Sequence, residues 1–194
     1  GALSSACEKG HQWECALQLV HGLLQGRQNG DVFACSAAVS ACEKCHQWRW
    51  ALWLLREARC AELEPNVVTC SAAISACEKG MQWERTLQLI KEMQARELQP
   101  NMVTFAAVIS ACEKGQQWER VLALVLEMRT SRMHPNLIAC NAAISACEKG
   151  KQWQAALGLL AGAQRQQLQL DLFTYSAALS SCEKGQQWGW ALWL

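Results

Sequence analysis

The apolar and polar positions of the chain repeat with the period of an α-helix, most clearly between Val67 and Asn101. The first half of this segment, 68–79, is Ala-rich and carries small side chains, which predicts a helix that its neighbours can approach closely. The second half, 82–96, places large apolar residues on one face of a second helix, at steps of four, three and three: Trp83, Leu87, Ile90 and Met93. We therefore expect two successive helices.

Three residues predict where these helices end. Gly80 separates the two halves, and its missing Cβ suits a left-handed position at the end of the first helix. Pro100 cannot continue the second helix, and Asn101 is a good N-cap for the helix that follows. The segment is thus predicted to form a helical hairpin with a tight turn.

The hairpin recurs with a period of 35 residues. The phrase Ala-Cys-Glu-Lys-Gly, or a near copy, begins at Ala6, Ala41, Ala76, Ala111, Ala146 and Ser181. Each copy is followed at the same spacing by a tryptophan: Trp13, Trp48, Trp83, Trp118, Trp153 and Trp188. The period defines a single repeat array over residues 1–194, in which partial units 1–31 and 172–194 flank four complete units, 32–66, 67–101, 102–136 and 137–171.

One hairpin cannot bury its Trp and Leu side chains alone, whereas stacked hairpins cover one another. The predicted fold is therefore all-α: a right-handed α-solenoid superhelix of helix-turn-helix repeats, with the first helix of each unit on the concave side. The Trp column is predicted to pack between repeats rather than to bind a ligand.

The composition narrows the possible functions. Apolar residues make up 51% of the chain and charged residues 18%, which is typical of a folded protein. No stretch approaches the roughly 20 uninterrupted apolar residues of a membrane span, so we expect no membrane partner. The net charge of +1 gives no general attraction to nucleic acid, so such binding would depend on where the charges lie.

The 12 cysteines do not suggest a disulfide framework. Six of them recur once per period inside predicted helices, as small buried residues would, and this favours a reducing compartment: Cys7, Cys42, Cys77, Cys112, Cys147 and Cys182. The pair Cys42 and Cys45 has no second pair or nearby histidines, so no zinc site is expected. The chain opens without an initiator Met or a leader and stops inside a repeat, which suggests a fragment.

The unit from Val67 to Asn101 resembles the pentatricopeptide repeat. It has the opening Val-Thr run, the central Lys and Gly, the second helix with Leu and Met, and the closing Pro-Asn of that family. The resemblance covers essentially the whole chain. It departs from the family pattern in the Trp column, in the cysteines that replace a tyrosine, and in the unit 137–171, which closes with Leu-Asp. It implies an organellar protein, of the chloroplast or the mitochondrion.

One column of the repeat is basic. Six of the eight lysines fall at one repeat position: Lys9, Lys44, Lys79, Lys114, Lys149 and Lys184. We expect Lys44, Lys79, Lys114 and Lys149 to contact successive phosphates of a nucleic acid. The alternative is that these lysines complement the helix dipole or pair with the glutamates of the same phrase, of which Glu8 is the first.

Two polar columns lie at the ends of each unit. The closing column holds five of the seven Asn and Asp residues of the chain, Asp31, Asn66, Asn101, Asn136 and Asp171, and helix capping alone would explain it. The column near the start of each first helix holds Ser36, Ser71, Ala106, Asn141 and Ser176, and close packing alone would explain it. From the residues alone, both interpretations remain open.

The family resemblance joins these columns into a site for single-stranded RNA. It implies one base per repeat, with the early-helix residue and the closing residue contacting the base edge. Ser36 with Asn66 and Ser71 with Asn101 are then expected to select adenine, and Asn141 with Asp171 uracil. Ala106 with Asn136 has lost a polar group, and Ser176 lacks its closing residue. An apolar column would sandwich the bases: Phe33, Val68, Val103, Ile138 and Phe173.

Other functions have less support. A helical scaffold for a protein or peptide partner is the main alternative, and the near-neutral charge permits it. The sequence contains no zinc-deaminase motif, no carboxylate cluster of a nuclease and no phosphate-binding loop. We therefore expect no enzyme, no cofactor, no metal and no small-molecule substrate. The expected role is sequence-selective RNA binding in organelle RNA processing, stability or translation.

Overall fold

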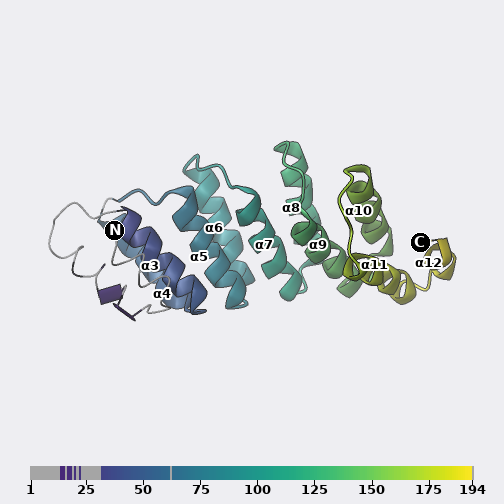
Figure 1. Cartoon of the computed structure of the whole chain (residues 1–194), viewed down its shortest axis with the longest axis horizontal. Helices are drawn as coiled ribbons and strands as arrows, with labels where there is room; N and C mark the ends of the chain where they lie inside the picture. Colours follow the sequence, from purple (N-terminus) through teal and green to yellow (C-terminus); the bar gives the residue numbers. More distant parts are fainter. Residues whose placement is uncertain are drawn as a thin grey trace. The chain divides into compact units, whose positions relative to one another are not determined.

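The repeat pattern translates directly into helices in the computed structural model. The model describes residues 32–193 except 62, together with residues 14, 15, 17, 18, 20 and 22; Lys9, Trp13 and Asp31 lie outside the described residues. Every regular element in the described part is α-helical (Figure 1). In chain order the elements are α3 (Val32–Lys44), α4 (Trp48–Cys60), α5 (Val67–Lys79), α6 (Trp83–Ala95), α7 (Met102–Lys114), α8 (Trp118–Thr130), α9 (Leu137–Lys149), α10 (Trp153–Arg165), α11 (Leu172–Lys184) and α12 (Trp188–Trp193).

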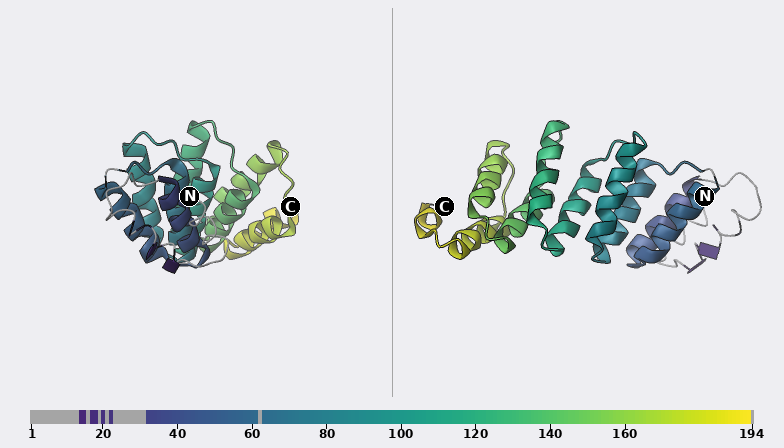
Figure 2. Two further views of the ribbon diagram at one scale, coloured as in Figure 1. Left: turned by 60° about the vertical axis from the view of Figure 1, so that its left-hand side comes forward. Right: turned by 180° about the vertical axis from the view of Figure 1, so that it is seen from behind.

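The helices form two compact units, one up to Thr104 and one from Phe105 onwards. In the first unit α3 packs on α5, and α4 contacts both of these helices. In the second unit α9 packs on α11, and α10 contacts both (Figure 2). Helices α4 and α10 therefore each bridge the first helix of their own repeat and that of the next. This is the stacking expected of an α-solenoid of two-helix repeats.

Small side chains line the contacts between first helices. Ala38, Ala41 and Cys42 of α3 are fully buried, as are Ala73 and Cys77 of α5. Side chains of this size let two helix backbones approach closely, as the Ala-rich pattern predicts. Burial raises the pKa of the Cys77 thiol to about 12, so this cysteine behaves as a small apolar residue. No helix of the described part has the length and apolar character that crossing a membrane requires.

The buried face of the second helix differs from the predicted one. In α6 the buried residues are Thr86, Leu89, Ile90 and Met93, whereas Trp83 and Leu87 are only half-buried. The prediction was wrong for Leu87, because α6 packs against a neighbouring first helix along the line of 86, 89, 90 and 93. Leu87 lies at the margin of that contact. The same register recurs in α8, where the buried residues are Val121, Leu124, Val125 and Met128.

The predicted left-handed conformation of Gly80 was also wrong. Gly80 has φ −82°, and the left-handed residue is the next one, Met81, with φ 57°. Glycine is needed here for close approach, because a Cβ on Gly80 would lie 2.3 Å from Cδ1 of Trp48. Trp48 thus covers the turn of the following repeat, and the prediction that the Trp column packs between repeats is confirmed there.

The same contact recurs in the second unit. A Cβ on Gly150 would lie 2.5 Å from Cδ1 of Trp118, and one on Gly185 would lie 2.5 Å from Cδ1 of Trp153. The rings of Trp118 and Trp153 are half-buried, while Trp188 is 62% exposed. The tryptophans therefore lie at the seam between repeats and not in a fully buried core.

Candidate functional site

A column of large apolar side chains is exposed at the start of the first helices. Its members are 56–77% exposed, although each is the second residue of an otherwise well-packed helix: Phe33, Val68, Val103, Ile138 and Phe173. Exposed apolar side chains that recur at one position of every repeat are typical of a binding surface. These are the residues predicted to sandwich bases.

The closing residues are helix N-caps. In Asn66, Asn101, Asn136 and Asp171, Oδ1 accepts a hydrogen bond of 2.9 Å from the backbone N–H three residues later. The interpretation of these four residues as caps is confirmed. A cap occupies only one side-chain atom. Nδ2 of each asparagine takes no part in the cap, and neither does Oδ2 of Asp171, which accepts a hydrogen bond from Asn141 over 3.1 Å.

The early-helix residues differ in exposure from repeat to repeat. Ser36 and Asn141 are half-buried, Ser71 and Ala106 are buried, and Ser176 is exposed. Asn141 directly meets its predicted companion, because its Nδ2 donates to Oδ2 of Asp171 over 3.1 Å. Ser176 instead donates to the backbone carbonyl of Phe173. The remaining serines reach their closing residues through a third side chain.

That third side chain is a buried threonine of the following repeat, which the sequence analysis overlooked. Oγ of Ser71 lies 2.6 Å from Oγ1 of Thr104, and Thr104 donates to Oδ1 of Asn101 over 2.9 Å. Thr69 joins Ser36 to Asn66 in the same way. Oγ1 of Thr174 lies 2.7 Å from Oδ1 of Asp171 and also contacts Asn141. The signal was present in the sequence as a spacing of 33 residues between the early-helix residue and the threonine.

These contacts determine the charge state of Asp171, the one carboxylate among the closing residues that the structure describes. Hydrogen bonds from the hydroxyl and the backbone N–H of Thr174 lower the pKa of Asp171 below its usual value, and Asn141 adds to the effect. Asp171 is therefore ionised at neutral pH, and its carboxylate can only accept hydrogen bonds.

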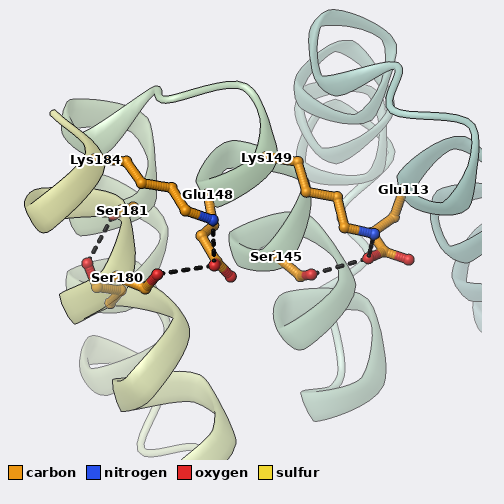
Figure 3. Close-up of polar contacts among 8 residues, drawn as sticks. Glu113, Ser145, Glu148, Lys149, Ser180, Ser181 and Lys184 are labelled. Atoms are coloured by element: carbon orange, nitrogen blue, oxygen red, sulfur yellow. Dashed lines mark hydrogen bonds and ion pairs between the residues drawn. The ribbon is translucent and has the colours of Figure 1, made fainter.

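The lysine column forms ion pairs between successive repeats. Nζ of Lys149 lies 2.6 Å from Oε1 of Glu113, and the pair Lys184 and Glu148 has a distance of 2.8 Å (Figure 3). In the first unit, Lys79 pairs with Glu43 over 2.9 Å. Each lysine thus contacts the glutamate of the preceding repeat, 36 residues earlier. Pairing with the glutamate column is confirmed for these three lysines, but each partner belongs to the preceding repeat and not to the lysine's own phrase.

A serine completes each of these contacts in the second unit. Ser145 donates to Glu113 and Ser180 donates to Glu148, both over 2.8 Å (Figure 3). Partial burial acts to raise the pKa of Glu148, but the hydrogen bonds from Lys184 and Ser180 outweigh it, so the pKa is lowered. Each ammonium group has three donors, so an ion pair leaves donors for a further ligand. Lys44 and Lys114, the remaining members predicted to contact phosphate, have exposed side chains.

The fold and the repeated polar pairs define a helical-repeat protein of the α-solenoid class. A model of the pentatricopeptide repeat domain matches residues 53–115 and 88–150, which together span half of the chain. The chain belongs to the pentatricopeptide repeat family. No curated protein matches it significantly in sequence.

Solved structures of this family share the fold. The chain is similar to the pentatricopeptide repeat domain of protein-only RNase P 1 from Arabidopsis thaliana, solved in complex with tRNA, with a TM-score of 0.82 and 12% identity over 94% of this chain and 96% of that one. It is also similar to the pentatricopeptide repeat protein PPR10 in complex with an 18-nucleotide psaJ RNA element, with a TM-score of 0.72 and 22% identity. That match covers 97% of this chain but only 27% of PPR10, so the chain spans about a quarter of its length.

Proposed function

We propose that the chain binds single-stranded RNA through the exposed apolar column and the adjacent polar pairs, with one base per complete repeat. The observation that carries the proposal is the pairing, in each complete repeat, of an exposed apolar side chain with a capping residue whose second polar side-chain atom takes no part in the cap. A nucleobase has an apolar face and a polar edge, so it matches both features. The two similar solved complexes hold tRNA and the psaJ RNA element.

The polar pairs suggest which base each repeat selects. Ser36 with Asn66 and Ser71 with Asn101 combine a hydroxyl with a free amide N–H, which suits the donor and acceptor on the edge of adenine. In the repeat 137–171, Asp171 can accept from N3–H of uracil while Asn141 donates to a uracil carbonyl. Ala106 offers no polar atom, so the repeat 102–136 is proposed to discriminate poorly with Asn136 alone. The direction of reading is taken from the family. In that direction, 5′ to 3′ along the four complete repeats, the proposed core site is A, A, an unselected base and U.

Lysines of the basic column are proposed to hold the RNA backbone. Lys44, Lys79, Lys114 and Lys149 would contact successive phosphates while keeping their contacts to the protein. Phosphate contacts do not depend on the RNA sequence, so they would supply affinity and not base selectivity. Family membership supports an organellar setting, in the chloroplast or the mitochondrion, and a role in RNA processing, stability or translation.

The proposal is tested by exchanging the polar pair of one repeat. Replacing Ser71 with Asn and Asn101 with Asp, while Thr104 stays, would recreate the arrangement of Asn141, Thr174 and Asp171. We expect the base facing this repeat to change from adenine towards uracil by about 1–3 kcal/mol. The measurement is competition between two short RNAs that differ only at that base, for the parent and the double variant.

A matched control is the single-site change Gln88→Asn on the exposed surface of α6, which should leave the ranking of the RNAs unchanged. Identical rankings by the parent and the double variant would contradict base reading by these columns. If the parent bound no RNA at any salt concentration, a scaffold for a protein partner would become the better interpretation.

A further inference from the structure

The buried threonines do more than complete the helix caps. Thr69, Thr104 and Thr174 are at most 1% exposed, and each contacts both polar columns of the proposed RNA site. A threonine hydroxyl has a single hydrogen, so its direction decides what its neighbours can do. The consequence is clearest at Thr104.

The hydrogen of Thr104 has one possible destination. Oδ1 of Asn101 can only accept, so the 2.9 Å contact requires Thr104 to donate to it. The 2.6 Å contact with Ser71 then requires the serine hydroxyl to donate to Thr104. Ser71 is left with lone pairs alone. Asn101 has its oxygen occupied twice, by Thr104 O–H and by Thr104 N–H, and keeps only Nδ2–H for a ligand.

We propose that Thr69, Thr104 and Thr174 are specificity-determining positioning residues, which decide the hydrogen-bonding atoms that each repeat presents to its base. In the two serine repeats the threonine leaves one acceptor and one donor in fixed places, which complements N6–H and N1 of adenine. Without it, the serine hydroxyl could rotate and donate as readily as it accepts, so it would accommodate O6 of guanine. This inference rests on the proposed function, and it deepens it.

A pattern along the chain supports this role over simple capping. The residue 33 positions after a polar early-helix residue is threonine, as in Ser36 with Thr69, Ser71 with Thr104 and Asn141 with Thr174. After a residue without a polar side chain it is alanine, as in Gly1 with Ala34 and Ala106 with Ala139. Threonine is therefore present where there is a polar side chain to orient.

Capping by itself does not need the hydroxyl. Asn136 caps α9 through the backbone N–H of Ala139 over 2.9 Å, the same distance as in the caps that include a threonine. Ala139 and Thr104 are both fully buried, so exposure does not distinguish the two positions. The hydroxyl thus serves the pair of base-facing side chains.

Removing the Thr104 hydroxyl is the direct test. Thr104→Val keeps the shape of the side chain, and we expect it to reduce the preference for adenine over guanine at the base facing Ser71 by about tenfold. Thr104→Ser retains a hydroxyl and should keep most of the preference. Thr86→Val is the matched control, because Thr86 is equally buried but its hydroxyl bonds only to the carbonyl of Trp83, over 2.7 Å. The readout is competition between RNAs that differ only at that base, with melting temperatures and the salt dependence of binding measured in parallel.

A gain-of-function pair covers the case in which Thr104→Val does not fold. Ala106→Ser alone should leave the repeat 102–136 without base preference, whereas Ala106→Ser with Ala139→Thr should create a preference for adenine. Equal preferences in the single and the double variant would overturn the inference.

The outcomes separate this inference from the proposed function. A parent protein that does not rank bases at the repeat 67–101 overturns both. A parent that ranks adenine first, and a Thr104→Val variant that ranks the bases identically, overturns only the role of threonine. A uniform loss of affinity together with a lower melting temperature would also overturn it, because it would assign Thr104 a purely structural role.

Discussion

The two ends of helix α9 differ in burial and in their neighbours. At the C-terminal end, Ala146 and Cys147 are fully buried, Lys149 pairs with Glu113, and the adjacent Gly150 lies beneath the Trp118 ring. At the N-terminal end, Ile138 is 65% exposed and Asn141 bonds to the exposed Asp171.

The two ends of the first helices also differ in how much their residues vary between repeats. The phrase at the C-terminal end is nearly the same in every repeat, because a new side chain there would disturb the packing of the next hairpin. The early-helix residue changes from Ser to Ala to Asn between repeats of otherwise similar sequence. The early-helix positions thus vary although Ser71 and Ala106 are buried, and differences between repeats are what a sequence-selective site requires. The C-terminal end of the first helix therefore stabilises the stack, and the N-terminal end carries the proposed RNA site.

The largest expected effect is loss of the contact between Trp118 and Gly150. Trp118→Ala should lower the free energy of unfolding by about 3 kcal/mol, at the low end of the range for buried Trp because the ring is half-buried. Gly150→Ala should cost about 1–3 kcal/mol, because its Cβ would lie 2.5 Å from Cδ1 and Cγ of the ring. Chemical denaturation of the two single variants and the double variant measures both. In the double variant the cost of the alanine should largely disappear, since the ring that it meets is gone.

Two controls sharpen this prediction. Trp188→Ala removes the tryptophan of the same column that is 62% exposed, and it should cost much less than Trp118→Ala. Gly158→Ala adds a Cβ in α10 with no neighbour within 4 Å, and it should raise the stability by about 0.5–1 kcal/mol. A double variant whose cost is the sum of the single costs would contradict the proposed contact energetics.

The sequence could predict where the helices and the tryptophans of this packing lie along the chain. The 35-residue period placed the first helix at 68–79 and the second at 82–96, within one residue of α5 and α6. It also identified the Trp column as repeat packing. It could not show that Gly80 serves the ring of Trp48 from the previous repeat rather than a left-handed turn, because that need arises from tertiary packing.

The candidate site was predictable to a similar degree. The repeat period identified the two polar columns and their positions, and the family resemblance joined them with the apolar column into one expected site. The threonines were overlooked because a spacing of 33 residues has no meaning in a single helix. It joins the start of one first helix to the start of the next, and it becomes a contact only when the repeats stack. The offset of 36 residues between Lys149 and Glu113 was missed for the same reason.

A smaller effect is expected at the exposed apolar column, where a substitution should weaken RNA binding and leave the stability of the fold almost unchanged. Ile138→Ser should change the free energy of unfolding by less than about 0.5 kcal/mol, because the side chain is already exposed. It should weaken RNA binding by about 1 kcal/mol if the side chain covers a base. Leu126→Ser is the matched control, since Leu126 is 60% exposed on the second helix α8 and should leave binding unchanged. Equal losses of affinity in both variants would mean that the column has no special part in binding.

The smallest effect on stability is expected at the lysine column. Lys149→Gln removes one exposed ion pair with Glu113 and should cost at most about 1 kcal/mol of unfolding free energy. If Lys149 also contacts a phosphate, the variant should bind all RNA sequences more weakly by the same factor. The slope of log K against log salt concentration should then flatten by about 0.7, the value for one phosphate contact on a single strand. Lys91→Gln is the control, because Lys91 is exposed on α6 outside the column and should leave the slope unchanged. If the Lys149 variant kept the parent's slope, the role of this lysine would be limited to joining two repeats through Glu113. That result would not bear on the proposed base selection at the opposite end of α9.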